Sequence, residues 1–157
     1  MKKQRGQAVV EFALVLPLFM CLLMCVIFAG LLFSDYMTLS NVARSSVREA
    51  SIQGPDNYST IINHYKTNTH LLTNLYNWPD LSQGNSMEFN EGEFDNSVEV
   101  TLTASLNNSF PGIPVLEMIF GRNVDGGTAF LPQNFVIKYT MYDESANTTN
   151  NSNGSSE

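Results

Sequence analysis

Apolar positions divide the chain into a continuously apolar N-terminal segment and a remainder in which apolar residues recur with a period. Residues 13–33 contain no charged side chain. These 21 residues would form a helix of about 31 Å at roughly 1.5 Å per residue. Because a hydrocarbon core is about 30 Å thick, the segment is predicted to be a transmembrane helix.

Beyond the span, apolar residues recur at spacings of three and four, which indicates one face of a helix. They are Leu39, Val42, Ala43, Val47 and Ala50. Gly54-Pro55 ends this pattern, so one helix of about 45 residues, or roughly 68 Å, is expected to run from the membrane into a small head. Arg44 and Arg48 project together from another face. They form either a solvated surface with ion pairs to the head or a contact for a partner.

A second amphipathic helix is expected over about residues 57–76, where apolar and aromatic positions again follow helical spacing. Asp56-Asn57 is its expected N-cap. Trp78-Pro79 is expected to break it. His64 and His70 lie in this segment six residues apart, on different faces, and no carboxylate or cysteine near them completes a metal-ligand set.

Two later segments read as strands. S-V-E-V-T-L-T-A-S-L, residues 97–106, alternates apolar and polar positions, and N-F-V-I-K-Y-T-M-Y, residues 134–142, is rich in aromatic and β-branched residues. We expect them to be antiparallel neighbours that cover the apolar stripe of the long helix. The acidic residues 86–95 are expected to form a turn, with calcium binding as an alternative.

Shorter elements complete the predicted α+β head. A short helix is expected from Pro114 to Phe120, stopped by Gly121, and V-D-G-G-T is expected to be a turn. The polar residues 143–157 are predicted to be a disordered tail, because they contain almost nothing to bury. The expected organisation is a leader at residues 1–6, a long helix at 7–53, a head at 54–142 and the tail.

Composition excludes several classes of function. The formal net charge is −7, which repels phosphate backbones, and nucleic-acid binding is therefore not expected. Cys21 and Cys25 both lie in the apolar segment and are interpreted as small apolar residues without a disulfide. No phosphate loop and no nucleophile–histidine–carboxylate set occurs, so neither an enzyme nor a cofactor is expected.

Glu11 is the one charged residue between Arg5 and Asp35, and it lies at the edge of the span. An ionisable residue at membrane depth is a functional hypothesis whose partner has to be named. If the chain is cut between Gly6 and Gln7, the new α-amino group at Gln7, with a reference pKa of about 7.7–8.0, is largely cationic. In a bundle of parallel, axially staggered helices, this amine can pair with Glu11 of a neighbouring subunit and set the register between them.

The flanking charges predict the topology. Lys2, Lys3 and Arg5 precede the span, so the N-terminus is expected to be cytoplasmic, with the head across the membrane. An ordinary secretory signal has an apolar core of about 7–15 residues, shorter than this one. A lipoprotein signal would need a small residue where Met20 and Met24 precede the cysteines. A plain single-span anchor fits the length and the charges but leaves Glu11 unexplained.

The stretch R-G-Q-A-V-V-E-F-A-L-V-L-P-L, together with N-V-A-R-S-S-V-R-E-A-S at residues 41–51, resembles the TadE-like family, the pilin-like proteins of tight-adherence (Flp) type IV pilus systems. The resemblance covers about the first 50 residues. It implies that a prepilin peptidase cuts between Gly6 and Gln7, that Glu11 is the pilin glutamate and that Phe12 is the aromatic residue after it. Trimming removes three cations, which changes the net charge from −7 to −10.

Pro17 lies inside the predicted span. A proline there removes one backbone hydrogen bond. It is either a tolerated membrane proline or a bend that lets a pilin-like helix adjust when it packs.

The resemblance further implies a minor pilin or pseudopilin, or an assembly factor. Its expected location is the inner membrane, with a periplasmic head and a possible place in the extracellular pilus. The expected partners are the major pilin, other pilin-like subunits, the prepilin peptidase, the inner-membrane assembly platform and the lipid membrane. The alternatives are a single-span anchor that displays a small binding domain and has no pilus role, and an envelope enzyme.

Overall fold

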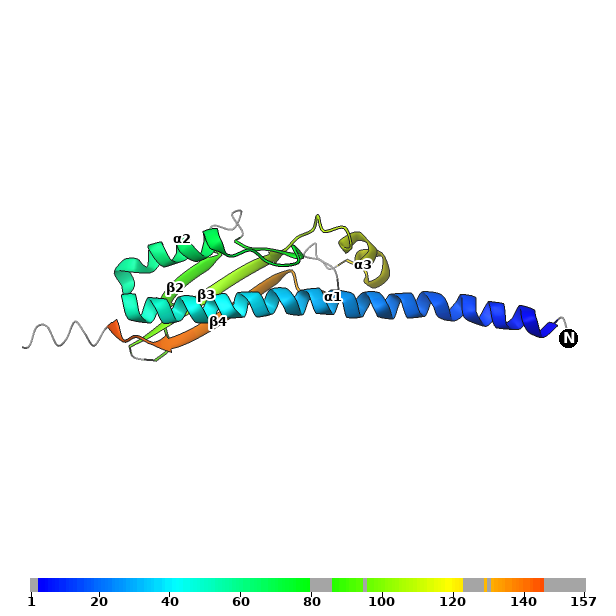
Figure 1. Cartoon of the computed structure of the whole chain (residues 1–157), viewed down its shortest axis with the longest axis horizontal. Helices are drawn as coiled ribbons and strands as arrows, with labels where there is room; N and C mark the ends of the chain where they lie inside the picture. The colour runs from blue at the N-terminus through cyan, green and yellow to red at the C-terminus, as the bar shows by residue number, and fades with distance from the viewer. Residues whose placement is uncertain (1–2, 80–85, 95, 123–128, 130, 146–157) are drawn as a thin grey trace, which may run out of the picture. The chain divides into compact units, whose positions relative to one another are not determined.

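The chain was analysed as a computed structural model that describes residues 3–79, 86–94, 96–122, 129 and 131–145. It divides into two compact units, Met1–Phe33 and Ser34–Glu157, which are described one at a time. Long helix, shorter helices and antiparallel sheet together confirm the predicted α+β fold (Figure 1).

One helix, α1 (Lys3–Gln53), supplies all the described structure of the first unit. In the described part of the chain it is the one helix long and apolar enough to cross a membrane. Most of its apolar side chains are exposed in this unit, as Leu14 (74%) and Leu18 (71%) illustrate, whereas Phe28 is buried. Lipid would cover the exposed apolar surface, which agrees with the predicted span.

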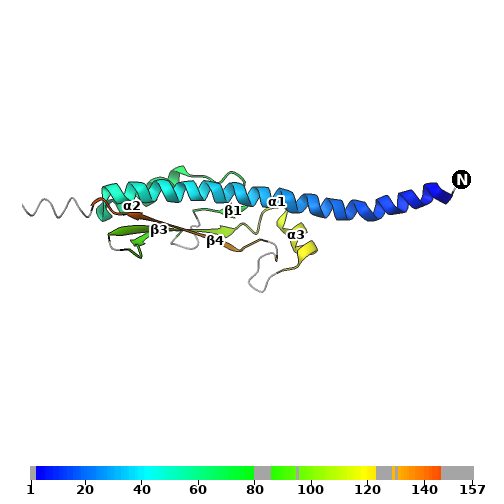
Figure 2. The same ribbon diagram turned by 90° about the horizontal axis from the view of Figure 1, so that it is seen from below.

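Within the second unit, the end of α1 buries a stripe, as its spacing predicts. Leu39, Val42, Ala43, Val47 and Ala50 are all at most 7% exposed, and the sheet lies against this side of the helix (Figure 2). The helix ends at Gln53, one residue before the predicted stop signal. Gly54 reverses the chain with φ +77, a conformation that favours a residue without Cβ, and its N–H binds the carbonyl of Ala50 at 3.0 Å.

The second helix is shorter than predicted. After a 3₁₀ turn, η1 (Pro55–Asn57), α2 covers Tyr58–Asn68, so the expectation of a helix to residue 76 is wrong. Asn57 occupies the N-cap position, but its side chain binds the carbonyl of Gln53 and caps no N–H of α2. Thr69 is extended and Thr73 is bound to the long helix, so the helical periodicity of the later apolar residues is accidental.

A four-stranded antiparallel sheet forms the other layer of the head. Its strands are β1 (Tyr76–Asn77), β2 (Met87–Glu91), β3 (Ser97–Leu106) and β4 (Asn134–Tyr142). β3 pairs with all three others, and β4 follows it from Ser97↔Tyr142 to Ser105↔Asn134. Because β4 occupies one edge of β3 along this length, β1 and β2 share the opposite edge, and β4 is an edge strand.

The sheet confirms one prediction and corrects another. Val98, Val100, Leu102, Ala104 and Leu106 are buried and alternate with half-buried polar residues, as predicted. The acidic segment is not wholly a turn, because its first half is β2, in register with β3 from Met87↔Leu102 to Glu91↔Val98. Asp95, the V-D-G-G-T stretch at residues 124–128 and residues 146–157 of the predicted tail lie outside the described part of the chain.

The third helix, α3, covers Ile113–Phe120 and ends at Gly121, as its sequence predicts. Figure 1 shows it beyond the Leu106 end of β3, at the opposite end of the head from α2 and β2. It packs through Ile113 and Leu116, which are at most 1% exposed.

A buried carboxylate joins the long helix to the segment before β1. Asp35 is 0% exposed; its Oδ2 accepts a hydrogen bond of 2.6 Å from the Thr73 hydroxyl, and its Oδ1 accepts one of 3.3 Å from the Thr73 N–H. Burial, together with this nearby carboxylate, raises the pKa of Tyr76, whose hydroxyl donates to the carbonyl of Pro132 at 2.7 Å. Asp35 therefore fixes where the chain leaves α2 and enters the sheet.

Thr73→Val should destabilise the head by about 1–3 kcal/mol, because it leaves a buried carboxylate without its shorter hydrogen bond. The free energy of unfolding can be measured by denaturant titration of the full chain in detergent, with near-ultraviolet circular dichroism as the signal. Thr103→Val, on the half-exposed face of β3, is the matched control and should change stability by less than about 0.5 kcal/mol. Equal effects of the two variants would contradict the role assigned to Asp35.

Candidate functional site

The predicted processing and assembly residues all lie in the first turns of α1. Gln7 donates a hydrogen bond from Nε2 to Oε1 of Glu11 at 3.2 Å, as the four-residue spacing on a helix allows. Phe12 is 67% exposed. Gly6 and Gln7 are helical, so a peptidase would have to unwind this turn before it could bind the Gly6–Gln7 bond in an extended form.

The Glu11 carboxylate lacks a cationic neighbour within its own span. No Lys, Arg or His occurs between Gln7 and Phe33, and in the described helix the Glu11 carboxylate accepts a hydrogen bond from the side-chain amide of Gln7. A neutral donor relieves only part of the free energy that a carboxylate loses on leaving water. Glu11 is therefore an acceptor that a cation supplied by cleavage or by another chain would stabilise further.

Pro17 lies inside α1, ten residues after Gln7. It has no N–H to donate to the carbonyl of Ala13, four residues earlier. The helix continues through this position, so proline does not end the span, and the predicted bend stays a prediction.

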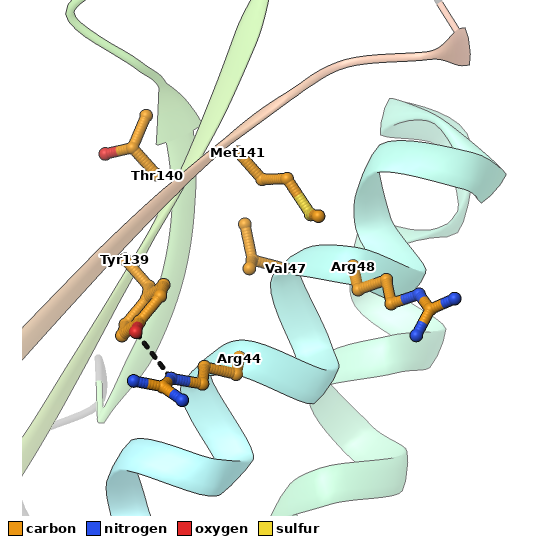
Figure 3. Close-up of a pocket in the computed structure, with 6 residues that line it drawn as sticks. All are labelled: Arg44, Val47, Arg48, Tyr139, Thr140 and Met141. Atoms are coloured by element: carbon orange, nitrogen blue, oxygen red, sulfur yellow. Dashed lines mark hydrogen bonds between the residues drawn. The ribbon is translucent and has the colours of Figure 1, made fainter.

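Arg44 and Arg48 flank an open groove of about 480 Å³ between α1 and β4, hereafter the α1–β4 groove. The other lining residues are Val47, Tyr139, Thr140 and Met141. Figure 3 shows Arg44 turned toward Tyr139 and Arg48 turned away from it, with Val47 between them. Arg44 donates from Nε to the Tyr139 hydroxyl at 2.5 Å.

Neither arginine is paired with a carboxylate in the described part of the chain. The ion pairs there are Arg122–Glu117 at 3.2 Å and Lys138–Glu99 at 3.1 Å. Both guanidinium groups are on exposed residues. The sequence predicted that they share a face, but it did not single out Tyr139 or Met141, although alternation along β4 puts both on the helix-facing side.

The described residues offer no metal site. They contain no group of three or more His, Cys, Asp or Glu side chains placed to hold an ion. His64 contacts the side chain of Asn68, and Cys21 and Cys25 are free thiols, as expected. The calcium alternative at the acidic segment therefore has no support from its described residues.

Comparison with protein families adds to this geometry. The family model described as TadE-like protein matches residues 6–48. The N-terminal segment is therefore similar to this family. The match starts at Gly6 and includes Glu11, Phe12, Pro17, Arg44 and Arg48, and it ends before any strand of the sheet. No curated protein and no solved structure gave a significant match to the chain.

The match confirms the suspected resemblance of the N-terminal segment to the TadE-like family of tight-adherence pilus systems. The long apolar α1 fits a single-pass anchor of a pilus-associated protein. The TadE-like family is a pilus-related family and not a family of enzymes.

Arg44→Ala and Arg48→Ala should each change the free energy of unfolding by less than about 0.5 kcal/mol, because both residues are exposed and neither is in a described ion pair. Denaturant titration of the full chain in detergent measures this. Val47→Asp is the contrasting variant: Val47 is 1% exposed, and burying an unpaired carboxylate there should be strongly destabilising. A large loss of stability in either alanine variant would show that the arginines hold the head together.

Proposed function

We propose that the protein is a pilin-like subunit, a minor pilin or pseudopilin, or an assembly factor of a tight-adherence type IV pilus. A prepilin peptidase removes residues 1–6 on the cytoplasmic side of the inner membrane. The head lies in the periplasm, and α1 packs against the major pilin and other pilin-like subunits. The inner-membrane assembly platform is a further partner.

The observation that carries the proposal is the TadE-like match, which begins at Gly6. Cleavage after Gly6 places Glu11 at the fifth position of the mature chain and exposes a cation at Gln7. The span then contains one acceptor, the Glu11 carboxylate, and one donor, the amine, separated by four residues along the helix. Two parallel helices with an axial offset of about 6 Å, four residues at roughly 1.5 Å each, bring the amine of one beside the carboxylate of the other.

This pairing would set the register between subunits, whereas apolar packing alone permits several registers. Phe12, beside Glu11 and 67% exposed, adds an aromatic contact surface at the same level. Pro17 leaves the carbonyl of Ala13 without its helical donor, and in this proposal the resulting local freedom lets the helix adjust to neighbours.

Cleavage is tested by mass spectrometry of the membrane-extracted protein. The mature chain should begin at Gln7, and Gly6→Val should remain uncut because a β-branched side chain obstructs the extended approach to the peptidase. Gly30→Val is the control: a Cβ there meets nothing within 4 Å, so trimming should proceed. A chain that still begins at Met1 in wild-type cells with a working peptidase, or a mature N-terminus near Gly30, would contradict the proposal.

Replacing Glu11 separates the proposal from a plain anchor. Glu11→Leu should insert at normal levels yet abolish piliation, because the amine of the neighbouring subunit loses its acceptor. Leu14→Met, on an exposed side chain in the same segment, should leave piliation unchanged. Filaments are counted by electron microscopy of sheared fractions, alongside immunoblots of the membrane fraction. Normal piliation in Glu11→Leu would favour a single-span anchor with a small binding domain and no pilus role.

Arg44 and Arg48 enter the proposal as a contact for an acidic partner at the α1–β4 groove. Within an acidic protein, these two cations pair with no carboxylate among the described residues, and opposite charge favours encounter with a carboxylate-bearing surface. Piliation lost in both alanine variants, at wild-type stability, supports this contact. Normal piliation leaves the two arginines as a solvated surface.

A further inference from the structure

The short helix α3 has an apolar face that the head leaves uncovered. Met118 is 89% exposed, and Val115 and Ile119 are each 45% exposed. These three residues are spaced by three and four, so they lie on one side of the helix. The opposite side holds the buried Ile113 and Leu116.

The exposed face carries no charge. Glu117, the one charged residue of α3, belongs to the other side and binds Arg122 at 3.2 Å. The neighbouring Pro114 is also exposed and presents no side-chain donor. A helix that adsorbs to anionic headgroups carries Lys and Arg on its polar face. This face of α3 has neither, so its burial is favourable through the removal of apolar area from water.

Contacts within the head identify which end of it α3 occupies. Asp35 binds Thr73, and Tyr36 contacts the ring of Phe135 at 6.1 Å between centroids, so the start of the head's helix lies beside the Leu106 end of β3. The other end of the same helix lies beside the end of β4, where the N–H of Glu144 binds the carbonyl of Ser51 at 3.0 Å.

α3 belongs to the Asp35 end. The N–H of Asn107 binds the carbonyl of Leu75 at 2.9 Å, and a turn closed by Phe110 N–H to Asn107 carbonyl leads into α3 (Figure 1). A second exposed apolar side chain lies at this end: Leu72, 77% exposed and adjacent to Thr73.

Asp35 is only two residues after Phe33, the last residue of the uncharged span. At roughly 1.5 Å per helical residue, covalent continuity keeps the Asp35 end of the head within a few ångströms of the end of the span. An uncharged apolar patch therefore occurs at the one end of the head that the chain tethers to the bilayer.

We propose that α3, through Val115, Met118 and Ile119, together with Leu72, inserts into the acyl-chain boundary of the leaflet that faces the head. The occupant of this surface is lipid, because these side chains carry no charge and belong to the end of the head that follows the span directly in the chain. This proposal rests on the membrane span within the proposed function, but it does not require cleavage after Gly6 or a pilus.

The test uses the full chain, with Cys21→Ala and Cys25→Ala, reconstituted in phosphatidylcholine–phosphatidylglycerol vesicles. Single cysteines at Met118, Phe94 and Leu18 carry an environment-sensitive fluorophore, and spin-labelled lipids serve as quenchers. Phe94 is the matched control, since it is apolar and 71% exposed but lies beside the β2–β3 turn at the far end of the head. Leu18, 71% exposed, reports on the span itself.

Met118→Cys is expected to show blue-shifted emission and at least several-fold stronger quenching than Phe94→Cys, approaching that of Leu18→Cys. Quenching at Leu18 with none at Met118 would overturn this proposal alone and leave the proposed function intact. Loss of quenching at both would overturn the span and both proposals with it. Protection of Met118 by crosslinking to another copy or protein, without quenching, would assign the surface to a protein partner and overturn lipid as the occupant.

Discussion

Burial of one apolar stripe of α1 beneath an antiparallel sheet is the constraint on which the head depends. The same helix belongs to two environments: most apolar side chains of residues 13–33 are exposed, whereas Leu39 to Ala50 bury a single row. The change takes place around Asp35, where a buried carboxylate follows the largely exposed apolar segment. Its two bonds to Thr73 tie the sheet-bearing part of the chain to the first residues after the span.

Strict periodicity made much of this fold predictable. The stripe on α1 and the alternation of β3 each match one period, and each is buried as expected. The β-branched and aromatic run forms β4, in which Ile137 is the buried residue. The errors arose where a period was present by chance. Leu72 and Leu75 continue the helical spacing of α2, yet Thr73 is held by Asp35, 38 residues away in the chain. A hydrogen bond between distant residues cannot be read from a local window, so α2 was predicted too long.

The strand β2 was missed for a related reason. Its residues M-E-F-N-E are acidic and have low strand propensity, and they are extended because β3 offers them a partner edge. For the candidate sites, the sequence named the N-terminal residues and both arginines of the α1–β4 groove. It could not name Tyr139 as the partner of Arg44, since the two are 95 residues apart. The uncovered face of α3 also required the fold, because burial of Ile113 and Leu116 decides which side remains open.

The position of β4 has a consequence for how the protein is made. It is the last strand of the described residues, and it pairs along β3 from Ser97 to Ser105 and supplies Tyr139 and Met141 to the surface beside α1. If the head crosses the bilayer from its N-terminal to its C-terminal residues, then α1, α2 and the rest of the sheet emerge before Asn134, the first residue of β4. Until then the β3 edge and the stripe of α1 are incompletely covered. In the proposed topology, closure of the head therefore awaits the emergence of β4, and a chaperone in the compartment that receives the head would meet its open form.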